Sequence, residues 1–284
     1  MRLIGFNRNG ARFIGERQDD KIRVLAQVDD FYANPERYLA VQAGEIVDID
    51  AVDIAPPVPL TARVFCVGIN YREHAAESKL VAGIDEPKVP MVFGRWQNTL
   101  VVDGTPVPVP PREQGLDWEV ELAVIIGRKT WGATRESAYD AVLGYTAFND
   151  LSARMKQLET RQFTLGKNAD LSGPIGPVLV TADEIADPGN LRVVARVNGV
   201  VMQDANTRDF IHDIPRIISY ITDTVTLLPG DVIATGTPGG VGVGRNPPTF
   251  LVPGDVVEVE VEGIGAVRNP IISRAELDSH IAAE

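Results

Sequence analysis

The sequence predicts an α+β fold with a mixed, mainly β core and short helices packed outside it. Short segments rich in Val and Ile that end at Gly, Pro or Asn recur along the 284 residues, as is typical of strands. Patterns with helical spacing are fewer, and they do not alternate regularly with the strands. A doubly wound parallel sheet or a TIM barrel requires that alternation, so the pattern favours neither.

The first residues show the pattern of a small β-rich unit. Residues 2–16 are expected to form a hairpin, because Asn9-Gly10 can adopt the positive backbone dihedrals of a tight turn. A short strand is expected over residues 21–26 and a helical stretch over residues 35–41. We therefore expect a small unit that precedes the main domain.

A proline-rich segment separates this unit from the rest of the chain. Residues 55–59, Ala-Pro-Pro-Val-Pro, interrupt regular structure because proline lacks the N–H that helices and sheets use. We predict an N-terminal domain with its linker over residues 1–60 and the main domain over residues 61–284. The clearest helix covers residues 213–222, where Asp213 can cap the start of an apolar face. Strands are expected over residues 62–70, 118–127, 142–148, 191–198, 231–235 and 255–261.

Charge and composition limit the partners of the protein. The net charge is −12, from 27 Lys and Arg against 39 Asp and Glu, and the basic residues are scattered. Nucleic acid and anionic membranes both require clustered positive charge, so neither is expected. No apolar run reaches the ~18 residues of a membrane span, and the first residues lack the apolar core of a signal peptide. The single cysteine, Cys66, suits the cytoplasm, and its apolar strand favours a buried inert thiol over a nucleophile.

Several familiar motifs are incomplete. The glycines of residues 240–244 are followed by Pro247-Pro248, which cannot open the helix of a dinucleotide site. Gly166-Lys167 lacks the Ser or Thr of a phosphate-binding loop, and no Gly-x-Ser-x-Gly elbow occurs. The three histidines have no metal-ligand spacing. A metal site in this chain is therefore expected to use oxygen ligands.

Two glutamates on one strand and an aspartate at the end of another form a candidate metal site. Residues two apart on a strand point to the same face, so Glu119 and Glu121 are neighbours. Asp150 ends the next strand pattern and offers a third carboxylate. Like charges on a half-buried strand repel, so a cation should neutralise them. Oxygen ligands suit Mg²⁺ or Mn²⁺, with Ca²⁺ as a further candidate.

The alternative is a solvated Glu-x-Glu face without a metal. Glu258 and Glu260 have the same spacing, and we expect them on an exposed edge strand. The residues that follow distinguish the two pairs, because an apolar run follows Glu121 whereas a turn follows Glu262.

A histidine and a glutamate form a candidate general-base pair. Residues 71–77 have helical propensity, and on a helix His74 and Glu77 share a face. The carboxylate can then orient the imidazole and raise its basicity. The alternative is that both residues belong to an exposed helix start with no catalytic role.

Taken in order along the chain, these motifs resemble the fumarylacetoacetate hydrolase family. The resemblance covers residues 62–270. Within the family the chain is similar to acylpyruvate hydrolases and, through residues 173–177 and 246–248, to members that act on diketo-deoxy sugar acids. The motifs that carry the resemblance are Val67-Gly68-Ile69-Asn70-Tyr71 with His74 and Glu77, Glu119-x-Glu121, Gly144-Tyr145, Asn149-Asp150 with Arg154, Gly166-Lys167, Gly176-Pro177, Asn198-Gly199 and Thr235-Gly236-Thr237-Pro238.

The resemblance implies a fold, an assembly and a set of site residues. The fold is a mixed β-roll or sandwich with flanking short helices, assembled as a homodimer that binds Mg²⁺ or Mn²⁺. By position, the metal ligands would be Glu119, Glu121 and Asp150. The catalytic residues would be His74 and Glu77, which activate water, and Lys167, which binds developing negative charge. The substrate-binding residues would be Arg95, Arg154, Gln157 and Thr237.

The resemblance also implies an enzyme that acts on a small 2-oxo or diketo acid. The expected reaction is metal-dependent hydrolysis of a carbon–carbon bond in a β-diketo acid, such as an acylpyruvate. Decarboxylation of an oxaloacetate-type 2-oxo diacid is the alternative, because it passes through the same metal-stabilised enolate, and isomerisation of an unsaturated 2-oxo diacid is the third. A non-catalytic binding protein would be expected to have lost a ligand or the His74–Glu77 pair, and all are present.

Two residues depart from the pattern that many relatives share. Met155 stands where many have Asp, and Arg95 stands where many have Lys. Both positions are expected near the substrate, and a guanidinium presents a planar fork rather than a point charge. The departures leave the identity of the substrate open, although neither touches a predicted metal ligand.

Overall fold

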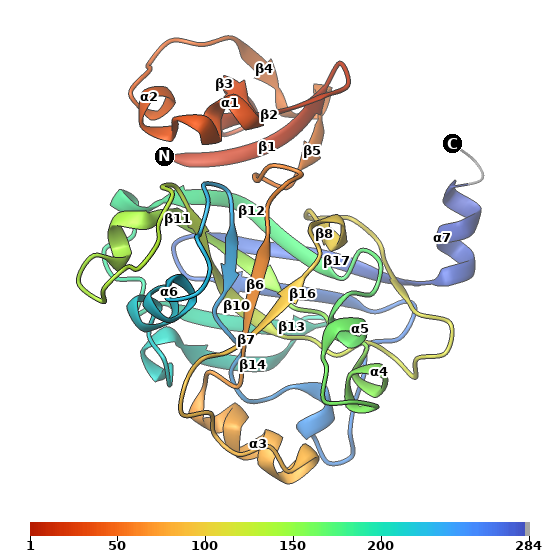
Figure 1. The fold of residues 1–284 in the computed structure, drawn as a ribbon. Coiled ribbons are helices and arrows are strands. Elements are labelled where there is room, and N and C mark those ends of the chain that lie inside the picture. Colours follow the sequence, from red (N-terminus) through yellow and green to blue (C-terminus); the bar gives the residue numbers. More distant parts are fainter. Residues whose placement is uncertain (282–284) are drawn as a thin grey trace.

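The computed structural model describes residues 1–281 and confirms an α+β fold in which strands predominate (Figure 1). The hairpin at the start of the chain forms as predicted, with Asn9 and Gly10 both at positive φ. One helix that the sequence did not predict, α1, follows the third strand. The N-terminal elements are β1 (Arg2–Arg8), β2 (Ala11–Gln18), β3 (Lys21–Gln27), α1 (Val28–Ala33), α2 (Pro35–Leu39), β4 (Ile46–Asp48) and β5 (Asp53–Ala55).

The rest of the chain forms the larger part of the molecule. Its strands are β6 (Val64–Gly68), β7 (Met91–Arg95), β8 (Leu100–Val101), β9 (Val107–Val109), β10 (Val120–Ile126), β11 (Val142–Asn149), β12 (Gly173–Thr181), β13 (Arg192–Val197), β14 (Val200–Asn206), β15 (Val232–Ala234), β16 (Val256–Val261) and β17 (Gly265–Ser273). Its helices are α3 (Arg72–Ala82), α4 (Arg154–Leu158), α5 (Thr164–Lys167), α6 (Ile214–Thr222) and α7 (Arg274–Ile281).

The strands assemble into two sheets. The 12-stranded sheet has the order β4-β3-β2-β1-β12-β11-β10-β15-β6-β7, with β5 paired to β1 and β8 paired to β12. The 5-stranded sheet has the order β14-β13-β16-β17-β9. Most pairs are antiparallel, but β15 runs parallel to β6, which makes the large sheet mixed as predicted.

The N-terminal unit joins the large sheet through β1. Arg2 and Leu3 pair with Val180 and Leu179 of β12, and the unit lies at one end of the molecule (Figure 1). Leu3 also shares an apolar cluster with Cys66, which is fully buried. The boundary near residue 60 stays a prediction, because the sheet runs without a break from the N-terminal unit into the rest of the chain.

Strand β10 lies in the centre of the core. It is flanked by β11 and β15, and every residue in it is buried. Leu122 and Val124 pack in one apolar cluster with Val259 of the small sheet, whereas Ala123 and Ile125 pack in another cluster. Because both faces of this strand are covered, the sequence after Glu121 is continuously apolar rather than alternating.

The predicted helix over residues 213–222 is confirmed as α6. The Asp213 side chain caps it by accepting a hydrogen bond from the Arg216 backbone N–H at 2.9 Å. Ile217 and Ile218 of this helix are fully buried. Across residues 1–281, no helix combines the length and the apolar character that crossing a bilayer requires.

The prediction of an exposed edge at Glu258 and Glu260 is wrong. Their strand, β16, lies inside the small sheet between β13 and β17. Both glutamates pair with Arg196 of the neighbouring strand, at 2.8 and 2.7 Å. Cross-strand pairing with a cation therefore accounts for this Glu-x-Glu pair.

Close backbone approach in the large sheet makes Gly144 of β11 intolerant of any side chain. A Cβ atom at this position would lie 2.1 Å from the carbonyl oxygen of Val180 on β12. We expect Gly144→Ala to lower the free energy of unfolding by about 2 kcal/mol or more, measured by urea denaturation. Gly94→Ala is the matched control, because a Cβ there meets no atom within 4 Å. Equal stability of the two variants would contradict this account of the β11–β12 contact.

Candidate active site

The pairing of β10 with β11 brings three acidic residues to one point. Glu121 lies opposite Phe148, and the Asp150 backbone N–H donates to the Glu119 carbonyl at 3.0 Å. Glu119, just before β10, and Asp150, just after β11, therefore lie side by side. One carboxylate oxygen from each of Glu119, Glu121 and Asp150 lies within 4.8 Å of the others, and all three residues are buried.

Two cations hold Glu119 in its charged form. Lys167 Nζ lies 2.6 Å from one carboxylate oxygen of Glu119, and Arg154 Nη2 lies 2.6 Å from the other. Burial alone would raise the pKa of Glu119, but the charges of Lys167 and Arg154 outweigh it and lower that pKa to about 2. Glu119 is consequently a permanent anion at neutral pH.

The surroundings of Glu121 have the opposite effect and disfavour its charged form. Burial raises the pKa of Glu121 well above its usual range, and the negative charges of Asp150 and Glu119 raise it further. One of its oxygens accepts a hydrogen bond from the Gly236 backbone N–H at 2.7 Å. A divalent cation beside Glu121 would supply the positive charge that this carboxylate needs. The donor set, three buried carboxylates, fits a hard cation such as Mg²⁺ or Mn²⁺.

Lys167 reaches the acidic residues because α4 and α5 pack closely. Its Nζ atom also donates to Asp150 at 2.8 Å. Burial would lower the pKa of Lys167, but Asp150 and Glu119 outweigh it, so the pKa is raised and the ammonium stays charged. Gly166 permits this position, because a Cβ there would lie 2.3 Å from the Cβ of Gln157 on α4.

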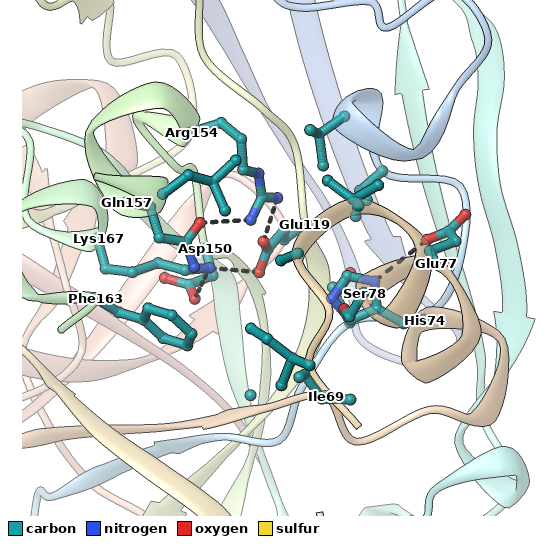
Figure 2. Close-up of a pocket in the computed structure, with 18 of the residues that line it drawn as sticks. Ile69, His74, Glu77, Ser78, Glu119, Asp150, Arg154, Gln157, Phe163 and Lys167 are labelled. Atoms are coloured by element: carbon teal, nitrogen blue, oxygen red, sulfur yellow. Dashed lines mark hydrogen bonds and ion pairs between the residues drawn. The ribbon is translucent and has the colours of Figure 1, made fainter. Parts of the chain in front are cut away.

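A cavity separates the acidic residues from helix α3. Figure 2 shows Glu119, Arg154 and Lys167 on one side and His74 with Glu77 on the other. Apolar side chains complete much of its wall. These include Val67, Ile69, Val81, Ile84, Phe93, Leu158, Phe163, Val241 and Val243. Phe93 and Phe163 pack edge to face, and the Phe93 ring covers Lys167 Nζ with its centroid at 5.5 Å.

His74 and Glu77 form a pair on α3, as their spacing predicted. His74 Nδ1 lies 3.3 Å from one carboxylate oxygen of Glu77, and the Gly240 backbone N–H donates to the other at 2.8 Å. Since a carboxylate only accepts, Nδ1 is the donor of this contact, which would leave Nε2 of a neutral imidazole as the acceptor. Both residues line the cavity, and His74 is buried, so the exposed helix start that we considered is not what forms.

The predicted substrate-binding residues divide into two groups. Arg154, Gln157 and Thr237 line the cavity. Arg95 does not: it is fully buried behind Asp150, where Nε and Nη2 donate to one Asp150 oxygen at 2.9 and 2.6 Å. Met155 lines a groove on the outer side of α4. Neither Arg95 nor Met155 lines the cavity, so their placement near the substrate stays a prediction, and the structure gives Arg95 the role of a partner of Asp150 instead.

Sequence reasoning missed two features of the site. The first is Asp117, a fully buried carboxylate that bonds to Arg154. The second is the segment 240–243, excluded above as a nucleotide site, whose valines line the cavity. The only sequence signal for Asp117 was its spacing of two residues from Glu119 along one strand. For the segment 240–243 the sequence offers no local signal.

Comparison with known proteins identifies a matching family and similar proteins. Residues 63–272 match the family described as Fumarylacetoacetate (FAA) hydrolase C-terminal. Oxaloacetate tautomerase FAHD2A, mitochondrial, of Homo sapiens is 41% identical over 238 residues, which are 83% of this chain and 74% of that protein. Oxaloacetate tautomerase YisK of Bacillus subtilis (strain 168) is 39% identical over 260 residues, which are 88% of this chain and 85% of that protein.

A solved structure extends the likeness to nearly the whole chain. The crystal structure of 2-hydroxyhepta-2,4-diene-1,7-dioate isomerase from Mycobacterium marinum has a TM-score of 0.78 and 32% identity. The comparison covers 96% of this chain and 99% of that one. With the matched family residues, it shows that this chain belongs to the fumarylacetoacetate hydrolase family, as its motifs predicted.

Proposed function

We propose that this protein is a metal-dependent tautomerase that interconverts the keto and enol forms of oxaloacetate-type 2-oxo diacids. The observation that carries the proposal is the placement of two proton-holding groups around one carboxylate cluster. His74 faces the cluster across the cavity, and Lys167 bonds directly to it. Keto–enol exchange requires a proton to be handled at carbon and another at oxygen, and these two groups supply one position for each.

Glu119, Glu121 and Asp150 would hold the metal. When bound, a divalent cation there would polarise the 2-oxo group of the substrate and stabilise negative charge on its oxygen. Arg95 would keep Asp150 in place for this role, because its two bonds fix the carboxylate oxygen that faces away from Lys167.

His74 would handle the proton at carbon. Glu77 holds Nδ1, so Nε2 is free to take the proton from C3 of the keto form. The electrons of the broken C–H bond then form the C2=C3 double bond of the enol. When the enol leaves, Nε2 would release this proton to solvent, which returns His74 to its starting state. In the reverse direction a protonated Nε2 would deliver a solvent-derived proton to C3.

Lys167 would handle the charge and the proton at oxygen. Its ammonium, held between Glu119 and Asp150, would donate a hydrogen bond to the 2-oxo oxygen as that oxygen gains electron density. It would then pass on the proton that forms the enol O–H and take one back from solvent. Arg154 would bind a substrate carboxylate, with Gln157 and Thr237 lining the same space. The apolar rings of Phe93 and Phe163 would keep water from this side of the cavity.

The names of the relatives favour isomerisation over hydrolysis. Both compared relatives are oxaloacetate tautomerases, and the compared structure is that of an isomerase of an unsaturated diacid. Our first prediction from sequence was hydrolysis by the His74–Glu77 pair. The same pair can transfer a proton without any attacking water. The site is therefore compatible with the isomerisation that the relatives' names support.

Product analysis by NMR separates the three reactions. We expect the metal-loaded protein to speed the approach of oxaloacetate to its keto–enol equilibrium and to incorporate solvent deuterium at C3. Pyruvate formed from oxaloacetate faster than with free metal would make decarboxylation the activity. Acetate and pyruvate formed from acetylpyruvate would restore our first prediction, hydrolysis.

Three further properties stay predictions of the family resemblance and of the composition. These are the use of Mg²⁺ or Mn²⁺, assembly as a homodimer, and a cytoplasmic location. The buried Cys66 is compatible with a reducing compartment, and burial raises the pKa of its thiol. The relative from Homo sapiens is named as mitochondrial.

A further inference from the structure

Asp117 is a charged residue outside the cavity that organises two of its walls. It lies two residues before Glu119, and its side chain is completely buried. Backbone hydrogen bonds with Ser152, at 2.9 and 3.0 Å in the two directions, fix it beside the start of α4. It does not line the cavity, so it does not touch the substrate itself.

Asp117 determines which donors of Arg154 are available. Its Oδ2 accepts from Arg154 Nε at 3.0 Å. Arg154 Nη1 donates to Gln157 and Nη2 donates to Glu119, each at 2.6 Å. A guanidinium has five N–H donors, so one hydrogen on each terminal nitrogen stays uncommitted. Because Arg154 lines the cavity, these two hydrogens are available to a carboxylate there.

The same carboxylate holds the opposite wall. The backbone N–H groups of Gly242 and Val243 donate to Asp117 at 2.6 and 2.9 Å. Val243 lines the cavity, and Gly240 of the same segment donates to Glu77, the partner of His74. Asp117 therefore joins the Arg154 side of the cavity to the segment that supports the His74–Glu77 pair.

Three N–H donors converge on Asp117, and this requires a carboxylate rather than an amide. An asparagine would offer one oxygen, and its NH₂ group would face at least one of the three donors. The donor left without an acceptor would be buried, which is costly. Oδ2 accepts from both Arg154 and Val243, whereas Oδ1 accepts from Gly242. An asparagine that turns its oxygen to Gly242 therefore loses Arg154, whose flexible side chain can shift, whereas the backbone donors stay in their segment.

We infer that Asp117 is the positioning residue that aims Arg154 at a substrate carboxylate, and that it thereby sets the affinity for dicarboxylate ligands. The inference rests on the proposed function in assigning the carboxylate to a 2-oxo diacid. It does not require turnover, because a dicarboxylate probe such as oxalate presents the same group to Arg154.

The test compares Asp117→Asn with wild-type protein loaded with Mn²⁺. By calorimetry we expect oxalate to bind about tenfold more weakly, and KM for oxaloacetate to rise by a similar factor. We expect kcat and the Kd for Mn²⁺ to change less than oxalate affinity does, because Asp117 touches neither the reacting atoms nor a metal-binding carboxylate. It reaches the His74–Glu77 pair and Glu119 only through the segment of Gly240 and through Arg154. A merely structural role would lower kcat and metal affinity together with oxalate affinity, and that result would overturn the inference.

A double-mutant cycle with Arg154→Met tests whether Asp117 acts through Arg154. In that background we expect Asp117→Asn to change oxalate affinity by less than about twofold. The full tenfold loss in the Arg154→Met background would overturn the inference. If Asp117→Asn does not fold, Arg154→Lys gives the test instead. Lysine keeps the positive charge but lacks the two terminal N–H groups with which a guanidinium can bind a carboxylate. Wild-type oxalate affinity in Arg154→Lys would overturn the inference, and a loss matching that of Arg154→Met would support it.

These outcomes are distinguishable from failure of the proposed function. If the wild-type protein binds oxalate but does not tautomerise oxaloacetate, the proposed function is wrong. The oxalate affinity of Asp117→Asn then still decides the role of Asp117. If it tautomerises oxaloacetate while Asp117→Asn leaves both oxalate affinity and KM unchanged, the role of Asp117 alone is wrong.

Discussion

Replacement of Glu121 by glutamine is expected to weaken Mn²⁺ binding by more than about a hundredfold and to abolish metal-dependent turnover. Loss of a residue beyond the ligands costs about ten- to a hundredfold in metal affinity, and loss of a charged ligand should cost more. Glu121 is the cleanest of the three positions to change, because the Lys167 and Arg154 bonds of the cluster go to Glu119 and Asp150. Calorimetric titration of the metal-free protein measures the effect.

The same variant should be more stable than the wild-type protein when both are metal-free. Burial, Asp150 and Glu119 raise the pKa of Glu121, so the metal-free folded protein keeps a proton there up to a higher pH than the unfolded chain does. The stability linked to this proton is present at acid pH and is lost as the pH rises toward the raised pKa. Glutamine resembles the neutral acid and can still accept from Gly236.

Thermal unfolding across pH checks this expectation. We predict that metal-free Glu121→Gln unfolds at a higher temperature than wild type at neutral pH, and that the difference shrinks in acid. A variant that binds Mn²⁺ as well as wild type would show that Glu121 is not a ligand. A variant less stable than wild type at neutral pH would show that Glu121 is not strained by its neighbours.

Replacement of His74 by alanine is expected to lower kcat by about 10²- to 10⁴-fold, which is the usual contribution of a general base. The Kd for Mn²⁺ should change by less than about threefold, because the carboxylates that would hold the metal take their bonds from Lys167, Arg154, Arg95 and Gly236 instead. Deuterium exchange at C3 of oxaloacetate, followed by NMR with the metal-loaded variant, measures the loss directly. Unchanged exchange would show that another group takes the proton.

Glu77→Gln is the matched control for the histidine. A glutamine oxygen can still accept from Nδ1, so the imidazole keeps its tautomer but loses the support of a negative charge. We expect a smaller loss of kcat than in His74→Ala, with metal affinity again unchanged. If Glu77→Gln were the more damaging change, the pair would act through the Gly240 contact of Glu77 rather than through the imidazole.

Local periodicity predicted the parts of the site that belong to single elements. The two-residue spacing placed Glu119 beside Glu121, and the three-residue spacing placed His74 beside Glu77. Each of these inferences needed only the geometry of one strand or one helix. The resemblance to the family then assigned roles to residues such as Lys167, whose position depends on elements far apart in the chain.

The relations between distant elements were not predictable from the sequence. Periodicity does not distinguish an interior strand from an edge strand, so Glu258 and Glu260 were misplaced and their pairing with Arg196 was missed. Arg95 was expected near the substrate, whereas in the structure its side chain bonds to Asp150, a residue 55 positions away. Asp117 accepts from residues more than 100 positions away, and no local pattern contains that information.

The rate at which freshly dissolved enol oxaloacetate converts to the keto form tests the central claim most directly. The measurement uses stopped-flow absorbance of the enol with metal-stripped protein, alone and with added Mg²⁺ or Mn²⁺, beside the same additions to Glu121→Gln. We predict acceleration only when wild-type protein and metal are both present, without release of pyruvate. Equal rates with and without protein, or acceleration that persists in Glu121→Gln, would contradict a tautomerase built on these three carboxylates.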